Sequence, residues 1–201
     1  STDVDFALPY FVFDKLDGSN IRAEWTPKRG FYKFGSRTQL LTPDQVPLWP
    51  AQDRILALEE TLGPALARLK AERVVCFFEW FGPSSFAGSH TDPVEAMELA
   101  LLDIDVFKKG RLAPRAVLDL AAAAGVKSPT LLHEGLVHQK LLDDVRLGNL
   151  PGVTFEGIVA KTTEPVKTEG GPRMFKHKAK AWLELLRQVC GEDEALFHRL
   201  K

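Results

Sequence analysis

A continuous apolar stretch at residues 10–13 and alternating apolar residues at 21–25 begin the chain's pattern, which predicts three short strands joined by turns. The predicted strands cover residues 11–18 (FVFDKLDG), 20–25 (NIRAEW) and 31–40 (FYKFGSRTQL). Asp17-Gly18 and the segment ending at Gly30 supply the turn residues between them. These residues therefore predict antiparallel hairpins.

Between residues 51 and 72 the period changes from two to three and four, which predicts an amphipathic helix. Gly63-Pro64 is expected to break or kink this helix, because proline lacks the amide hydrogen and crowds the preceding turn. The apolar positions that set the helical period are Ile55, Leu58, Leu62, Leu66 and Leu69.

The rest of the chain alternates between apolar runs and helical patterns. Predicted strands cover 74–82, 99–107, 155–161 and 173–180, and predicted helices cover 114–124, 136–147 and 181–190. Trp182, in the last helix, is expected to be a packing residue. Strands and helices do not follow a strict β-α-β order, so we predict an α+β fold with antiparallel sheets flanked by helices.

The composition is that of a globular protein, with 201 residues, 45% hydrophobic and 26% charged side chains. A net charge of −1 argues against a protein coated in basic charge for non-specific nucleic-acid binding. No apolar run reaches the ~18 residues of a membrane helix, so no membrane association is expected. Cys76 and Cys190 lack metal-binding spacing, which predicts free thiols and a cytoplasmic location.

Charge is unevenly distributed despite this balance. Residues 15–37 and residues 161–187 each carry a net charge of +4. The two segments are either separate solvated faces or, if they converge in space, a local site for an anion.

Several charged residues fall inside or next to apolar strands, where an unpaired charge is costly. These residues form either buried salt bridges or a reactive site. A deprotonated lysine could attack a phosphate, other cations could neutralise the phosphate charge, and carboxylates could hold Mg²⁺ through water. No Gly-x4-Gly-Lys-Ser/Thr motif is present. The charged residues in question are Lys15, Asp17, Glu79, Glu156, Lys176 and Lys178.

The order of these residues resembles the motifs of the covalent nucleotidyltransferases, in the form found in ATP-dependent RNA ligases similar to RNA ligase 2. The segment 15–20 (KLDGSN) resembles motif I, and 35–38 (GSRT) resembles the arginine-bearing segment that follows it. Segments 78–82 (FEWFG), 155–161 (FEGIVAK) and 175–178 (FKHK) resemble motifs III, IV and V. Any one of these is weak, but the ordered set covers residues 10 to about 185.

The resemblance implies a role for each basic residue. Lys15 would carry AMP as a phosphoramidate, and Arg37 would contact phosphate or ribose and help position a 5′-phosphate. Lys176 and Lys178 would bind the α-phosphate and orient the leaving pyrophosphate. The implied fold is a nucleotidyltransferase adenylation domain, ATP-grasp-like in its arrangement.

The same resemblance assigns the carboxylates to ribose and metal. Glu79 would bind the ribose or the waters of the metal, and Asp17 and Glu156 would hold those waters. The implied cosubstrate is ATP and the implied metal is Mg²⁺, with Mn²⁺ as an alternative.

Two features depart from the family pattern. The adenine-stacking element, usually Phe-Asp-Ile, reads Leu102-Asp103-Ile104, so an aliphatic contact from Leu102 is expected in place of an aromatic one. The sequence continues only 23 residues beyond Lys178. We therefore expect a single domain over residues 1–201 with no C-terminal oligonucleotide-binding or helical domain.

The expected function is ATP-dependent RNA ligation in RNA repair, with RNA carrying 5′-phosphate and 3′-hydroxyl ends as the partner. Ser19-Asn20, in place of the arginine-containing sequel typical of DNA ligases, favours RNA. Three alternatives remain open: a DNA ligase, a capping-type guanylyltransferase, and a non-catalytic module that binds nucleotides or RNA.

Overall fold

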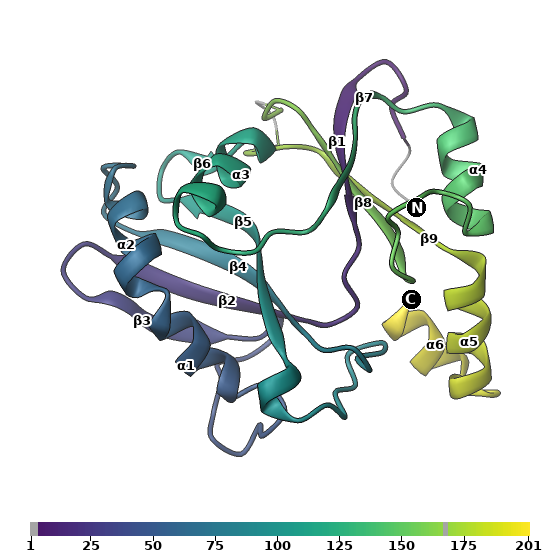
Figure 1. The fold of residues 1–201 in the computed structure, drawn as a ribbon, viewed down its shortest axis with the longest axis horizontal. Coiled ribbons are helices and arrows are strands. Elements are labelled where there is room, and N and C mark those ends of the chain that lie inside the picture. The colour runs from purple at the N-terminus through teal and green to yellow at the C-terminus, as the bar shows by residue number, and fades with distance from the viewer. Residues whose placement is uncertain (1–3, 167–168) are drawn as a thin grey trace.

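Two antiparallel sheets and the helices that flank them make up the computed structural model, which describes residues 4–166 and 169–201 (Figure 1). The larger sheet has the order β3-β2-β4-β5-β6 and the smaller has the order β7-β1-β8-β9. Every strand pair is antiparallel, which confirms the predicted fold class. The strands of the larger sheet are β2 (Ser19–Thr26), β3 (Gly30–Gly35), β4 (Val74–Phe81), β5 (Glu98–Val106) and β6 (Gly110–Arg111). Those of the smaller sheet are β1 (Pro9–Asp14), β7 (Leu131–Leu136), β8 (Gly157–Thr162) and β9 (Met174–Lys178).

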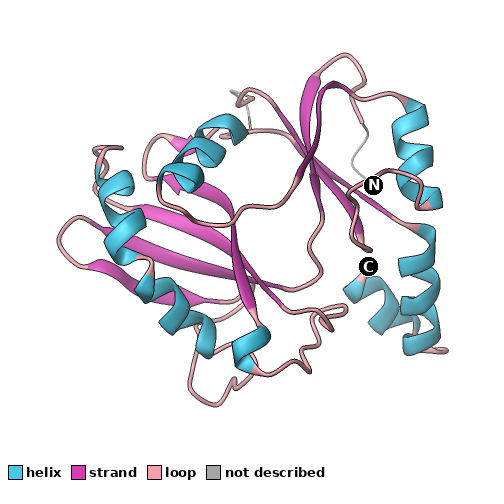
Figure 2. Cartoon of the chain, viewed as in Figure 1, coloured by secondary structure: helices cyan, strands magenta, loops and turns pink. Residues whose placement is uncertain are grey.

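Helices lie on the outer sides of both sheets, with α4, α5 and α6 on the side of the molecule opposite to α1 and α2 (Figure 2). Because strand side chains alternate between faces, one face of β2 buries Ile21, Ala23 and Trp25 in the larger hydrophobic core. The helices are α1 (Pro50–Ala57), α2 (Glu59–Ala67), α3 (Pro114–Ala123), α4 (Gln139–Leu147), α5 (Lys180–Cys190) and α6 (Glu194–Leu200), with a 3₁₀ turn at Val94–Ala96. Within the ranges described, no helix has the length and apolar character needed to cross a membrane.

The segment between β1 and β2 passes from one sheet to the other and carries the predicted nucleophile. Gly18 is required there because a Cβ atom at this position would collide with the carbonyl oxygen of Trp80 on β4. The amide of Lys15 donates to the carbonyl of Gly157 at 2.9 Å, which anchors the segment to β8. The turn is therefore fixed against both sheets.

The predicted helix break at Gly63-Pro64 is wrong. The break lies at Leu58, between α1 and α2, and Pro64 lies inside α2. The carboxylate of Glu59 accepts hydrogen bonds from Trp25 Nε1 at 3.0 Å and from the amide of Phe31 at 3.1 Å. A Cβ atom at Gly63 would lie 2.6 Å from that carboxylate, so the glycine makes room for a buried polar contact.

Two elements of the smaller half were not predicted from the sequence. Residues 131–136, of which Leu136 was expected to be helical, form β7, which lies at the edge of the smaller sheet and pairs with β1. Residues 194–200 form α6, whose N-terminus is capped by the Asp193 side chain accepting from the amide of Leu196 at 2.8 Å. Helices α5 and α6 share a small core that contains Trp182 and Phe197.

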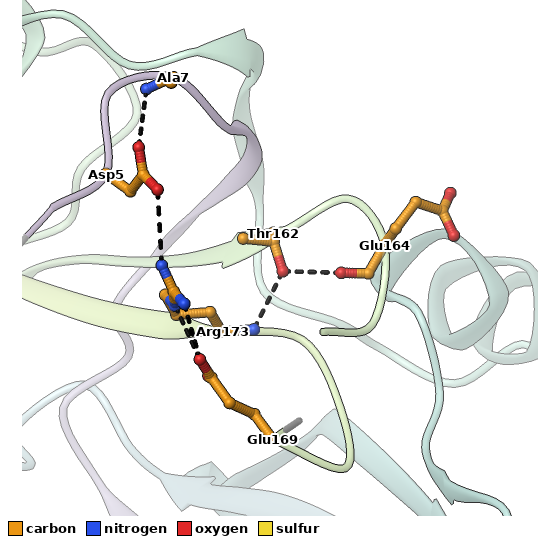
Figure 3. A network of polar contacts seen from close by, with 6 residues as sticks. All are labelled: Asp5, Ala7, Thr162, Glu164, Glu169 and Arg173. Atoms are coloured by element: carbon orange, nitrogen blue, oxygen red, sulfur yellow. Dashed lines mark hydrogen bonds and ion pairs between the residues drawn. The ribbon is translucent and has the colours of Figure 1, made fainter. Parts of the chain in front are cut away.

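A polar network fixes the end of the smaller sheet that lies away from Lys15 (Figure 3). Arg173 donates to Glu169 at 2.8 and 2.9 Å and lies 3.6 Å from Asp5. The hydroxyl of Thr162 accepts from the amide of Arg173 and donates to the carbonyl of Glu164. These contacts connect the segment before β1 to the loop between β8 and β9.

Candidate active site

A cavity of about 570 Å³ separates the two sheets, within the size range of small-molecule sites. Its wall includes the turn between β1 and β2, the cleft-facing residues of β4 and β5, and parts of β8, β9, α5 and α6. All the site residues predicted from the sequence line this cavity: Lys15, Asp17, Arg37, Glu79, Leu102, Glu156, Lys176 and Lys178.

One carboxylate bridges two lysines at one end of the cavity. Lys15 Nζ lies 2.7 Å from Glu156 Oε2, and Lys178 Nζ lies 2.7 Å from Glu156 Oε1. Glu156 is only 4% exposed, so both lysines neutralise a charge that would be costly to bury alone. Burial lowers the pKa of Lys178, and its contact with Glu156 opposes that effect.

Glycine allows Glu156 to reach this position. Gly157 begins β8 with φ +137°, a conformation that other residues rarely adopt. A Cβ atom there would also collide with the backbone of His177 on β9. The carbonyl of Glu156 accepts from the amide of Ala179 at 3.0 Å, which connects it to the start of α5.

Asp17 ties a loop and a helix to the turn that carries Lys15. Its Oδ1 accepts from the amide of Ala87 at 2.8 Å, and its Oδ2 accepts from Trp182 Nε1 at 2.6 Å. Burial raises the pKa of Asp17, while the hydrogen bond from Trp182 opposes the increase. Trp182 is fully buried, which agrees with the expected packing role, but its ring also lies 3.6 Å beneath Lys178 Nζ.

Glu79 is a buried carboxylate on the cleft-facing side of β4. Burial is the main cause that raises its pKa from its ordinary value of 4.5 to about 7. The neighbouring carboxylates of Glu156 and Asp17 add to this increase, whereas Lys15 and Lys176 oppose it. Glu79 is therefore poised to change its charge near neutral pH.

Arg37 and Lys176 supply positive charge to the same cavity. Neither residue forms an ion pair within residues 4–166 and 169–201. Desolvation lowers the pKa of Lys176, and the nearby cations Lys15 and Arg37 lower it further. These two side chains are free to receive an anion.

The two basic segments of the sequence do converge. Lys15 and Arg37 from the first meet Lys161, Lys176 and Lys178 from the second around one cavity. Other members form surface ion pairs instead, such as Lys33 with Glu24 and Arg187 with Glu194. Lys167 lies outside the described residues.

The wall of the cavity also has apolar side chains that could contact a base. They are Phe77, Leu102, Val159 and Met174, with Arg111 beside Phe77. The guanidinium of Arg111 lies 5.0 Å from the centre of the Phe77 ring. The cavity thus combines apolar and cationic side chains, as a nucleotide requires.

The model of the RNA ligase family matches residues 8–178, most of the chain and nearly all of the cavity wall. The chain belongs to the RNA ligase family. No curated protein sequence matches the chain at a significant level.

Solved RNA ligases share the fold. The structure of Naegleria gruberi RNA ligase with PPi has a TM-score of 0.64 at 21% identity, over 90% of this chain and 52% of that one. An alanine mutant of the same ligase with ATP and Mn has a TM-score of 0.63 at 21% identity, over 89% and 51% of the two chains. This member of the RNA ligase family therefore spans about half the length of the solved ligases that it matches.

Sequence reasoning missed several residues that line the cavity of this RNA ligase family member. Lys161 and Asp103 form a buried ion pair at 2.8 Å. Both are charged residues inside apolar strands, the same signal that singled out Glu79, so this pair could have been found. The contribution of α6 and the residue after it, which bring Arg199 and Lys201 to the cavity, had no comparable signal.

The metal assignment stays a prediction. No group of three or more His, Cys, Asp or Glu side chains in the described parts of the chain is arranged to bind a metal ion directly. Asp17 and Glu156 accept hydrogen bonds from protein groups on both of their oxygens. Contact with the metal through its water molecules, as predicted, needs no direct ligand cluster.

We expect the free energy of unfolding of Glu79→Gln, measured relative to that of the wild-type protein, to increase as the pH rises from about 4 to about 8. Because the folded-state pKa of Glu79 is about 7 rather than 4.5, the folded protein retains a proton that the unfolded chain loses. Ionisation of Glu79 therefore lowers the free energy of unfolding of the wild-type protein by roughly 3 kcal/mol as the pH rises through this window. Thermal unfolding at both pH values measures the difference.

The matched control for this comparison is Glu98→Gln. Glu98 is half-exposed and paired with Lys127 on the surface, so its replacement should leave the pH dependence unchanged. Equal pH dependence of Glu79→Gln and the wild-type protein would contradict the raised pKa of Glu79.

Proposed function

We propose that the chain is the nucleotidyltransferase unit of an ATP-dependent RNA ligase that works through a covalent lysyl-AMP. The observation that carries the proposal is the convergence of Lys15, Glu156 and Lys178 at one end of a cavity of nucleotide size. Membership of the RNA ligase family supports it independently. Both sheets wall this one cavity, which supports treating residues 1–201 as a single adenylation domain.

In the first step, Lys15 Nζ attacks the α-phosphorus of ATP. A P–N bond forms, the bond to the β-phosphate oxygen breaks, and pyrophosphate leaves with the electron pair while the amine loses its proton. Lys176 and Lys178 neutralise the charge that develops on the phosphates. Leu102 would contact the adenine, Glu79 would contact the ribose or the waters of the metal, and Arg37 would contact phosphate or ribose.

The carboxylates suit a hydrated cation held beside the phosphates. Asp17, Glu79 and Glu156 all line the cavity, and Mg²⁺ commonly keeps several water ligands when it binds phosphates. The metal, Mg²⁺ or Mn²⁺, would supply charge neutralisation at the phosphates. Two structures of mutant Naegleria gruberi RNA ligase with ATP and Mn support this assignment.

The later steps join two RNA ends. An oxygen of a 5′-phosphate attacks the phosphorus of the lysyl-AMP, which breaks the P–N bond and frees Lys15. A 3′-hydroxyl oxygen then attacks the same 5′-phosphate, so that AMP leaves and the hydroxyl proton is released. Arg37 is exposed at the cavity mouth and would help position the 5′-phosphate.

Incubation of the protein with Mg²⁺ and α-labelled ATP tests this proposal. Label that survives denaturation is the expected result, and label from GTP instead would indicate a guanylyltransferase. No covalent label from either nucleotide would support a non-catalytic binding module.

Joining of a nicked RNA duplex but not of the matching nicked DNA would then separate an RNA ligase from a DNA ligase. A nick should be sealed better than free strands at low salt, because it holds both ends at high effective concentration.

A further inference from the structure

The residue expected to contact the adenine sits in an irregularity of the larger sheet. Phe77 and Phe78 on β4 pair with Asp103 and Leu101 on β5, so Leu102 has no partner in the register and forms a β-bulge. A bulge disrupts the local ladder and redirects side chains, and bulges are common beside active sites. Here both Leu102 and Asp103 line the cavity.

A lysine from the other sheet holds this bulge. Lys161 on β8 donates to the carbonyl of Leu102 at 2.7 Å and to Asp103 Oδ1 at 2.8 Å. Lys161 and Asp103 are only 7% and 8% exposed. The contact crosses from the smaller sheet to the larger one, at the end of β8 away from Glu156.

We propose that Lys161 is a positioning residue for nucleotide binding, which sets the place of Leu102 and the spacing of the two sheets at the end of the cavity away from Glu156. This inference rests on the proposed function, because it takes the nucleoside to bind at that end. Lys161 is separated along β8 from the end that carries Lys15 and Glu156. Its loss should therefore weaken nucleotide binding and leave the chemistry of the lysines in place.

The first test is Lys161→Met, compared with the wild-type protein. The concentration of ATP that gives half-maximal labelling should rise at least tenfold, with the maximal rate changed by less than threefold. The dissociation constant for ADP, measured by calorimetry, should rise by a similar factor. An unchanged dissociation constant, or a loss of maximal rate alone, would overturn the proposal.

A double variant separates the effect of Lys161 on nucleotide binding from its effect on the stability of the fold. Removing Lys161 alone leaves the Asp103 charge buried and unpaired. The double variant, Lys161→Met with Asp103→Leu, replaces the ion pair by apolar side chains. Its melting temperature should therefore return to that of the wild-type protein. The carbonyl of Leu102 still lacks its donor, so the weak binding of ADP and ATP should persist. Recovery of both stability and nucleotide binding would show that the pair is only structural. This variant also carries the test if Lys161→Met does not fold.

Leu142→Ala provides the control for reduced stability. Leu142 is buried in the core between α4 and the smaller sheet and does not line the cavity. The variant should lower the melting temperature without changing the dissociation constant for ADP. If the wild-type protein binds ADP but never acquires label, the proposed function fails while the role of Lys161 is still decided by ADP binding.

Discussion

Lys15→Ala is expected to abolish the covalent label from ATP while leaving the fold intact. The P–N bond cannot form without the amine, so the loss should be complete. The stability cost should be small, because Glu156 keeps its second partner, Lys178, at 2.7 Å. Lys15→Arg should also fail, since the guanidinium stays protonated and cannot attack phosphorus.

The measurement is gel detection of label after denaturation, combined with a thermal melt of each variant. Lys140→Ala serves as the control, because Lys140 is 84% exposed on α4 and pairs with Asp144, and it is not among the described residues that line the cavity. It should label at the wild-type rate. Substantial labelling of either Lys15 variant would assign the nucleophile to another residue.

Glu156→Ala is expected to lose both stability and labelling, for two separable reasons. Removing the carboxylate leaves Lys15 and Lys178 as close, uncompensated charges, and breaking a buried pair in this way costs about 3–5 kcal/mol. Labelling should fall by roughly 10²-fold or more, since a preorganised group beside the reacting phosphates is gone. Extra Mg²⁺ should restore little of the rate.

Glu156→Gln keeps the shape of the side chain and isolates the effect of its charge. Single-turnover labelling, at a temperature where the melt shows the variant folded, reports the rate of the surviving protein. Glu134→Gln is the control, because Glu134 pairs with Arg115 at 2.7 Å but is half-exposed. A folded Glu156→Gln protein that labels at the wild-type rate would limit Glu156 to a salt-bridge role.

The sequence predicted the elements whose burial is reflected in the pattern of their own apolar and polar residues. Strand β2 buries alternate residues, and the sequence of β4 is apolar except at Glu79, so alternation identifies the first and a nearly continuous apolar run identifies the second. Strand β7 is an edge strand in which Glu134 and Leu136 are exposed and no side chain is fully buried. Its pattern therefore resembled a loop followed by a helix.

The sequence predicted which residues form the site, but it did not predict which contacts those residues make with one another. Local motifs placed Lys15, Glu156 and Lys178 together, because each motif comes from a strand end that the fold brings to one cavity. The contact of Lys161 with Leu102 depends on a bulge and on the distance between two sheets, and neither is encoded in a short segment. The partnership of Asp17 with Trp182 joins residues from opposite ends of the sequence in the same way.

The order of the strands also has a consequence for how the protein folds. The strands of the larger sheet all come from one continuous stretch, Ser19 to Arg111, whereas β1 must pair with β7 and β8 across that stretch, as Tyr10 does with Gly135 and Thr162. Closing such long loops is entropically unfavourable and slow, so the larger sheet should form first and the smaller sheet should close around it. Lys15, whose amide bonds to Gly157, then gains its neighbours only at that closure. A partly folded chain would hold a nearly complete larger sheet and no assembled nucleophile, so adenylylation would report on the last stage of folding.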